Sequence, residues 1–199
     1  MLRKDAWKNR QRGEEMKHLG SRTLETDRLL LRVFGPEDAG PMFRNWAGDP
    51  EVTKYLTWPT HSSEKVTAQI ISSWIEKNDE PTNYQWAIVW KETMEPIGSI
   101  SVVHWNEEIC QAEVGYCIGR PWWRRGITTE CFSAVIRFLF LEVGVNRIQA
   151  RHDVNNPHSG MVMEKCGLRH EGILRQADRN NQGICDMSVY GILRGDYET

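Results

Sequence analysis

The stretch Gly115-Tyr-Cys-Ile-Gly-Arg-Pro-Trp-Trp-Arg-Arg-Gly-Ile-Thr-Thr-Glu130 leads from a predicted strand through a short loop into a predicted helix. Residues 111–118 alternate apolar side chains on one face with other side chains on the second, which is typical of a strand. Residues 126–143 form the strongest helical segment of the chain, and Gly144 just beyond them suits a C-cap. A strand that runs directly into a helix N-terminus is therefore the centre of the predicted fold.

The loop inside this stretch has the composition of an anion site. The first turn of a helix carries free backbone N–H groups and the positive end of the helix dipole. Gly126 lets the backbone approach a ligand closely, and Arg124 and Arg125 add positive charge. Together these features suit a diphosphate. On the loop alone, a surface turn with solvated arginines is an equally good interpretation, because neither a Walker A motif nor Gly-x-Gly-x-x-Gly is present.

Outward from this stretch the chain alternates between strand and helix signals. The predicted strands are 29–33, 84–90, 97–105, 111–118, 147–152, 168–174 and 184–193, and the predicted helices begin near residues 36, 50, 63, 126 and 156. Val66, Ile70 and Trp74 form the expected apolar face of the third helix. The order predicts an α/β (α+β) domain with a mixed sheet rather than a doubly wound fold.

A second stretch, Asn155-Asn-Pro-His-Ser-Gly160, opens the helix after the strand at 147–152. Asn156 suits an N-cap and Pro157 the first helical position. Ser159 then lies in the first turn, where its hydroxyl can donate a proton or a hydrogen bond. The simpler interpretation, that Asn156 and Ser159 only cap the helix, is favoured by spacing alone.

Composition limits the function classes. The 199 residues are 40% hydrophobic and 26% charged, which indicates a folded globular protein. A net charge of −2 does not indicate a nucleic-acid partner. The apolar run at 134–145 is too short to span a membrane, and the N-terminus has no apolar signal segment. We therefore expect a cytoplasmic protein.

The five cysteines are odd in number and lack Cys-x-x-Cys spacing, so reduced, buried thiols are expected rather than disulfides or zinc ligands. The histidines show no metal-ligand spacing either, so no metal site is predicted.

Residues 1–22 differ from the rest of the chain, with seven Lys or Arg and three acidic residues. No apolar stripe at helical spacing runs through them. We expect a flexible or weakly docked arm here, and a single domain over residues 23–199. A basic arm that recruits an acidic partner is the alternative.

Taken in series, these motifs resemble the GNAT superfamily of N-acetyltransferases, and within it the ribosomal-protein N-terminal acetyltransferases. The resemblance covers roughly residues 24–193. It rests on Leu24-Glu-Thr-Asp-Arg-Leu-Leu-Leu-Arg32, Ala112-Glu-Val-Gly-Tyr116, Trp123-Arg-Arg-Gly-Ile-Thr-Thr-Glu130, and Asn156-Pro-His-Ser159 followed by Met163-Glu-Lys-Cys-Gly167. The phosphate loop departs from the family pattern at Thr128, where Gly or Ala is usual.

The resemblance implies a GNAT fold: a mixed, mostly antiparallel sheet flanked by helices, with splayed central parallel strands that admit the thioester of acetyl-CoA. It also implies the cofactor residues. The pyrophosphate would lie on the loop and first helical turn, and the pantetheine along the end of the preceding strand. The implied cofactor-binding residues are Cys117, Ile118, Arg124, Arg125, Gly126, Ile127, Thr128, Thr129, Asn156 and Ser159.

The chemistry of amide formation requires a group that takes the amine proton, a donor for the oxyanion and a proton for the leaving thiolate. A backbone N–H near Cys117 or Ile118 is the natural oxyanion donor. The resemblance assigns the proton for the thiolate to Ser159 and the base to Asp178, in Gln176-Ala-Asp178. Glu113 is the alternative base.

The predicted function is transfer of acetyl from acetyl-CoA to a primary amine, with the N-terminal amine of a protein, ribosomal proteins included, as the favoured acceptor. An α-amino group has a reference pKa of about 7.7–8.0 against about 10.4 for lysine, so a modest base deprotonates it. A small-molecule amine such as an antibiotic or polyamine, a non-catalytic acyl-CoA sensor and a protein-interaction domain are the alternatives. The oligomeric state stays open, a homodimer included.

Overall fold

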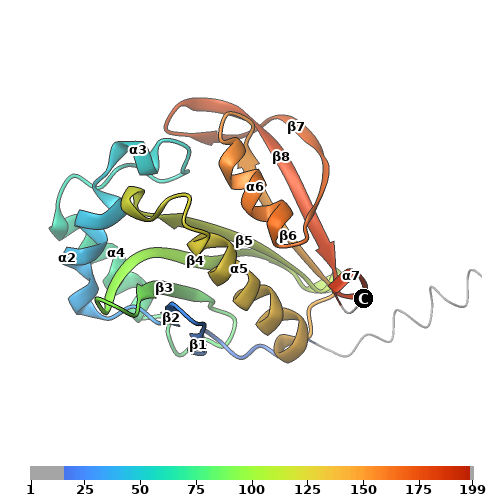
Figure 1. Ribbon diagram of the computed structural model, residues 1–199, viewed down its shortest axis with the longest axis horizontal. Coiled ribbons are helices and arrows are strands. Elements are labelled where there is room, and N and C mark those ends of the chain that lie inside the picture. The colour runs from blue at the N-terminus through green and yellow to red at the C-terminus, as the bar shows by residue number, and fades with distance from the viewer. Residues whose placement is uncertain (1–15, 198–199) are drawn as a thin grey trace, which may run out of the picture.

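The computed structural model describes residues 16–197, which fold around one eight-stranded sheet (Figure 1). The strand order is β1-β2-β3-β4-β5-β6-β8-β7, and every neighbouring pair is antiparallel except β5 and β6. The strands are β1 (Leu24–Glu25), β2 (Leu29–Arg32), β3 (Gln85–Trp90), β4 (Glu95–Asn106), β5 (Gln111–Ile118), β6 (Arg147–Asp153), β7 (Arg169–Asn180) and β8 (Gly183–Leu193). The predicted fold class is confirmed.

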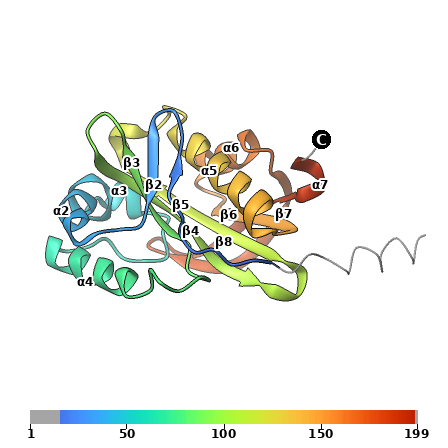
Figure 2. The ribbon, with the colours of Figure 1, turned by 90° about the horizontal axis from the view of Figure 1, so that it is seen from below.

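Helices cover both faces of the sheet (Figure 2). They are α2 (Ala39–Met42), α3 (Pro50–Thr53), α4 (Glu64–Ile75), α5 (Ile127–Phe138), α6 (Pro157–Lys165) and α7 (Arg194–Tyr197), with short 3₁₀ turns at 36–38, 107–109 and 120–122 and wider π turns at 43–47 and 139–143. The predicted long helix is α5 with its π turn, and Gly144 ends it in the left-handed conformation (φ 87°), which glycine adopts without a Cβ clash.

Strand alternation divides the core into two layers. Trp86 and Ile88 of β3 belong to the larger layer beneath α5, whereas Ala87 and Val89 of the same strand belong to the smaller layer with α2 and α4. Successive side chains of a strand point to opposite faces, so one strand supplies both layers. The sheet therefore separates the two helical layers.

The parallel pair β5 and β6 separates part-way along its length. The register joins Gln111 to Arg147, Ala112 to Ile148 and Glu113 to Gln149. Both strands continue beyond this point, to Ile118 and Asp153, without further pairing to each other. The two strands therefore form a fork that opens the middle of the sheet.

Strand β7 runs further than its sequence predicts. The expected end at Leu174 coincides with an irregularity in the pairing with β8 between Leu174 and Asp178, where Gln176 has a φ of 50°. Beyond this bulge the strand resumes, and Asp178 pairs with Cys185. A bulge interrupts the alternation of apolar side chains, which is why the sequence pattern stops there.

The predicted apolar face of α4 is wrong in part. Thr67 and Ile71 are the buried residues of this helix, Trp74 is half-buried against Phe34, and Ile70 is 37% exposed. The hydroxyl of Thr67 bonds to His61, so a polar residue occupies a core position that a search for apolar residues skips.

Residues 16–22 of the predicted N-terminal arm are docked on the domain. Met16 and Leu19 pack against the larger core layer. Lys17 N–H donates to the Val143 carbonyl at 2.8 Å, and the indole N–H of the buried Trp86 donates to the Arg22 carbonyl at 2.7 Å. The segment forms no helix, so a search for a helical stripe misses it. The rest of the predicted arm, 1–15, lies outside the described residues.

Removing residues 1–22 is therefore expected to destabilise the domain relative to a chain that lacks only residues 1–15. The longer deletion leaves the Trp86 N–H unpaired in the core and exposes the surface under Leu19, a loss of about 3 kcal/mol. For a domain of this size the thermal midpoint should fall by about 6–12 °C. Calorimetry of the two deleted chains checks this, and equal midpoints would contradict it.

Candidate active site

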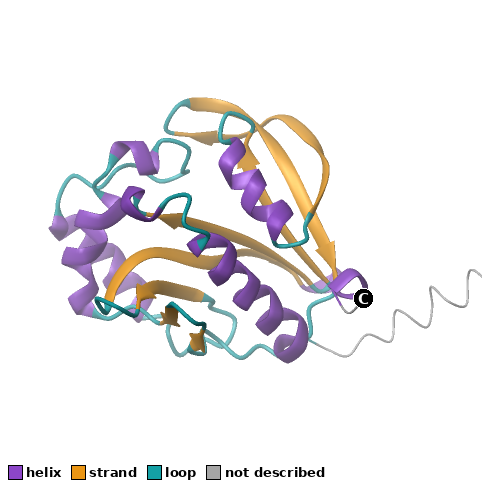
Figure 3. Ribbon diagram, in the orientation of Figure 1, coloured by secondary structure: helices purple, strands orange, loops and turns teal. Residues whose placement is uncertain are grey.

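A cleft of about 820 Å³ lies between the ends of α5 and α6, the end of β5 and the segment around α3. Figure 3 shows α5 and α6 side by side next to the loop that leads into α5. The residues that line the cleft are Val52, Tyr55, Leu56, Tyr116, Cys117, Ile118, Arg120, Trp122, Trp123, Arg124, Gly126, Ile127, Thr128, Thr129, Asn156, His158, Ser159, Met161, Val162 and Lys165.

One end of the cleft is formed by the N-terminus of α5. Gly126 stands at the N-cap in the left-handed conformation (φ 73°), and no side chain caps the helix among the described residues. Arg124, two residues earlier, also has a positive φ of 60°. A loop with such dihedral angles turns successive backbone N–H groups toward one side, and the helix dipole adds positive potential there. The backbone therefore offers an anion site at this end.

Side chains of α6 also line the cleft. The Arg124 guanidinium lies 3.4 Å from the ring nitrogen of His158. Lys165 lies about two turns further along the same face of α6. Residues 158, 161, 162 and 165 all line the cleft, which is the spacing of one face of a helix. The sequence prediction missed Lys165 and the two apolar residues of this face, although the spacing could have revealed them.

A pair of hydroxyl groups stands where the cleft reaches β5. Ser159 Oγ donates to the Tyr116 hydroxyl at 3.1 Å, and that hydroxyl donates to the Ser159 carbonyl at 2.9 Å. Burial raises the pKa of Tyr116 above its usual value, and the hydrogen bond from Ser159 offsets this only in part. Both groups therefore stay protonated at neutral pH. The sequence treated Tyr116 as a core residue of its strand and missed this pairing.

The two candidate bases share one arginine. Arg151 of β6 donates from Nε to Glu113 at 2.7 Å and pairs through Nη2 with Asp178 at 3.2 Å. Gln149 also donates to Glu113, at 3.1 Å. Glu113 precedes the fork on the face of β5 opposite Tyr116, because side chains alternate along a strand. The carboxylates therefore approach the fork from the face opposite α5.

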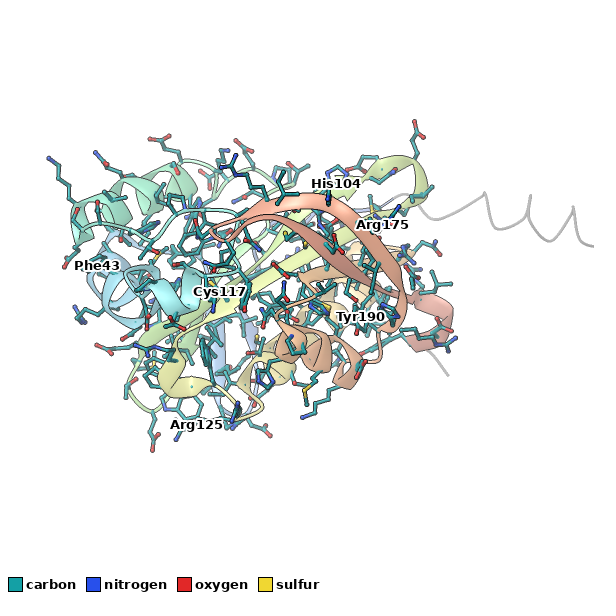
Figure 4. All side chains as sticks on the ribbon, turned by 90° about the horizontal axis from the view of Figure 1, so that it is seen from above. Phe43, His104, Cys117, Arg125, Arg175 and Tyr190 are labelled. Atoms are coloured by element: carbon teal, nitrogen blue, oxygen red, sulfur yellow. The ribbon has the colours of Figure 1, made fainter. Side chains whose placement is uncertain are left out.

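The structure brings most of the predicted site together. All of the predicted cofactor residues line the cleft except Arg125. Figure 4 shows Arg125 at the edge of the molecule, away from Cys117, which belongs to β5. Of the predicted catalytic residues, Ser159 lines the cleft, and Glu113 and Asp178 lie outside its lining. Asn156 occupies the N-cap position of α6 without a side-chain capping bond, so its amide remains available to the cleft. The catalytic roles stay predictions.

Comparison with known proteins identifies the family. A family model described as the acetyltransferase (GNAT) domain matches residues 28–169. The chain belongs to the GNAT acetyltransferase family. It is 33% identical over 171 residues to YoaA of Bacillus subtilis, named as an uncharacterized N-acetyltransferase, with 86% of this chain and 96% of that protein covered.

It is also 32% identical over 159 residues to the [ribosomal protein uS5]-alanine N-acetyltransferase of Escherichia coli, with 75% of this chain and 79% of that protein covered. Since these relatives are N-acetyltransferases, this GNAT protein is an acetyl-transferring enzyme. In fold it is similar to the acetyltransferase MccE, whose crystal structure contains acetyl-CoA and AMP, with a TM-score of 0.75, 20% identity, and 84% of this chain and 93% of that chain covered.

The cleft has the chemistry that acetyl-CoA requires. The uncapped amides of α5 and the charges of Arg124 and Lys165 suit a diphosphate. Between that end and the fork the lining includes Ile118, Ile127 and Val162, which suits the largely apolar pantetheine arm.

Within residues 16–197, no group of three or more His, Cys, Asp or Glu side chains is arranged to hold a metal ion. In the same part of the chain, every helix is too short or too polar to cross a membrane. All five cysteines are free thiols, of which Cys131 and Cys185 are buried.

Gly126→Glu is expected to abolish binding of CoA while the fold survives. A side chain at φ 73° is strained by about 1–2 kcal/mol, and the added carboxylate repels the diphosphate. Isothermal calorimetry should show affinity for CoA at least about a hundredfold weaker, since two charges of like sign would meet at close range.

Gly183→Glu is the matched control, because Gly183 also has a positive φ (110°), a Cβ there would meet open space, and it lies outside the cleft lining. The same strain is therefore introduced without a charge at the cleft. Gly183→Glu should bind CoA as the unmodified protein does. Unchanged affinity in a folded Gly126→Glu variant would contradict the assignment of this loop to the diphosphate.

Proposed function

We propose that this enzyme transfers acetyl from acetyl-CoA to the N-terminal α-amine of a protein, ribosomal proteins included. The observation that carries the proposal is the continuity of the cleft from the uncapped amides of α5 to Ser159 and Tyr116 at the fork. A cofactor that spans this distance presents its thioester where β5 and β6 part. The name of the uS5-alanine relative supports the acceptor class, and a cytoplasmic location belongs to the same proposal.

The reaction needs no covalent enzyme intermediate. The neutral amine attacks the thioester carbonyl, the C–N bond forms, and the oxyanion is held by a backbone N–H near Cys117 or Ile118. The C–S bond then breaks, and the Ser159 hydroxyl, which turns away from Tyr116, passes its proton to the CoA thiolate while it takes one from solvent, so that no serine alkoxide forms. Tyr116 acts through Ser159, because its two hydrogen bonds fix where that hydroxyl lies.

The amine proton goes to Asp178 in this proposal, with Glu113 as the rival base. Both carboxylates bond to Arg151, and carboxylates as a class are modest bases. An α-amine with a pKa of about 7.7–8.0 needs less help than a lysine with a pKa of about 10.4. The paired carboxylates therefore favour an N-terminal amine over a lysine side chain.

The test is an acceptor panel assayed by release of CoA. A peptide with a free N-terminal alanine is compared with the same peptide carrying a blocked N-terminus and an internal lysine, with a polyamine and with an aminoglycoside. Turnover of only the free N-terminus is the expected result. Turnover of only the polyamine or the aminoglycoside would replace the acceptor class by a small-molecule amine. CoA binding without turnover of any acceptor would indicate a sensor.

Asp178→Asn is expected to lower kcat by about 10²–10⁴-fold, the usual contribution of a positioned general base. The loss should shrink at high pH, where the amine deprotonates unaided, and affinity for acetyl-CoA should stay unchanged. The measurement is a pH profile of kcat. If Glu113→Gln shows this rescued defect and Asp178→Asn is silent, Glu113 is the base. If neither variant matters, positioning of the amine supplies the rate.

Ser159→Ala acts on the leaving thiolate, so its defect, about 10²-fold or more for a proton donor, should persist at high pH. An acyl donor with a better leaving group should reduce it. Tyr116→Phe removes only the hydroxyl that orients Ser159 and keeps the ring beside Phe132. It should show a smaller loss with the same pH profile. A Ser159→Ala defect that disappears at high pH would contradict the assignment of Ser159 as donor to the thiolate.

A further inference from the structure

The turn between β1 and β2 is fastened to the loop that begins the cleft. Arg28 Nε donates to Glu130 Oε2 at 2.7 Å, and Arg28 Nη2 lies 2.6 Å from the same oxygen. The third guanidinium nitrogen, Nη1, donates to the backbone carbonyl of Arg125 at 3.1 Å. One guanidinium therefore joins the first turn of α5 to the residue that precedes Gly126.

The second oxygen of Glu130 is held by the same turn. Thr26 Oγ1 donates to Glu130 Oε1 at 2.6 Å, and the Arg28 backbone N–H donates to it at 3.1 Å. Burial tends to raise the pKa of Glu130, but these hydrogen bonds and the Arg28 charge outweigh it and lower the pKa below its usual value. Glu130 is therefore ionised at neutral pH, with both oxygens committed to the turn.

These contacts lie next to the two residues of the loop that have a left-handed backbone conformation. Arg124 and Gly126 both have positive φ, and the Arg28 Nη2 atom lies 3.8 Å from the position that a Cβ on residue 126 would occupy. A non-glycine residue with positive φ persists only where its surroundings fix it. The hydrogen bond from Arg28 to the Arg125 carbonyl lies between these two residues along the chain.

We propose that Arg28 and Glu130 are positioning residues for the cofactor, which hold residues 124–128 in the shape that receives the diphosphate of CoA. This inference rests on the cofactor of the proposed function. Glu130 touches the turn rather than the cleft, since it is absent from the cleft lining, and Arg28 is absent from it as well. Both residues act through the backbone of the loop.

The charge of Glu130 makes the two possible roles predict opposite changes in the affinity for CoA. A carboxylate in the first turn of α5 lowers the positive potential at the anion site, so direct electrostatics predicts that Glu130→Gln strengthens the binding of CoA. Positioning predicts the opposite, because the amide of glutamine cannot accept hydrogen bonds at both ends from Thr26 and Arg28. The direction of the change therefore separates the two roles.

The experiment measures the affinity for CoA by calorimetry for Glu130→Gln, Arg28→Lys and the control Lys91→Ala. Loss of a charge-assisted hydrogen bond should weaken binding by about tenfold or more in the first two variants. Lysine keeps the charge of Arg28 but lacks the fork that reaches Glu130 and Arg125 together. Lys91 pairs with Glu25 and the Thr26 carbonyl of the same turn without touching the loop, so its variant should bind CoA normally.

Hydrogen exchange of the ligand-free proteins gives a readout that needs no cofactor. The amides of residues 124–128 should exchange faster in Glu130→Gln and Arg28→Lys than in the unmodified protein, while Lys91→Ala leaves them unchanged. A variant that fails to fold is recognised by its thermal midpoint, and the other member of the pair then carries the test.

Tighter binding of CoA by Glu130→Gln, or normal binding by Arg28→Lys, would overturn the positioning role while the proposed function stands. An equal loss in Lys91→Ala would reduce the effect to stability of the turn and would also overturn it. Absence of CoA binding in the unmodified protein would instead overturn the proposed function, and this inference with it.

Discussion

The end of pairing between β5 and β6 is the constraint on which the rest of the site depends. After Glu113 and Gln149 the two strands give up their shared ladder. Backbone polar groups that lose such a ladder need other partners, and a bound chain-like ligand can supply them. The sheet therefore lacks β5–β6 hydrogen bonds near the start of α5 and α6. The fork that results connects the two faces of the sheet.

The two faces contribute different chemistry to this fork. The helical face carries the hydroxyls of Ser159 and Tyr116 and the amides of α5, all suited to a thioester and its phosphates. The opposite face carries Glu113 and Asp178, joined through Arg151. In the proposed function the acyl donor and the amine approach one carbon atom from opposite sides of a single sheet, because the sheet separates their routes.

Long-range contacts keep the local motifs in shape. The loop before α5 has the right glycine and charges, but the positive φ of Arg124 is strained for a non-glycine residue and persists only where its surroundings fix it. The Thr26–Arg28 turn, about a hundred residues earlier in the chain, bonds to Glu130 and to the Arg125 carbonyl. Residues 16–22 similarly complete the core layer under α5 by pairing with Val143 and Trp86. The cleft is therefore supported by segments that do not line it.

The sequence by itself determined the order of the strands and helices apart from the short β1 and α7, the glycine C-cap at 144, and the loop and helix that line the cleft, because these features depend on neighbours along the chain. Its failures are of another kind. The docking of residues 16–22, the continuation of β7 through its bulge, the pairing of Tyr116 with Ser159 and the shared partner Arg151 all join residues distant in sequence. Only the tertiary structure decided them, since the path of the chain, rather than any local pattern, sets which distant groups meet.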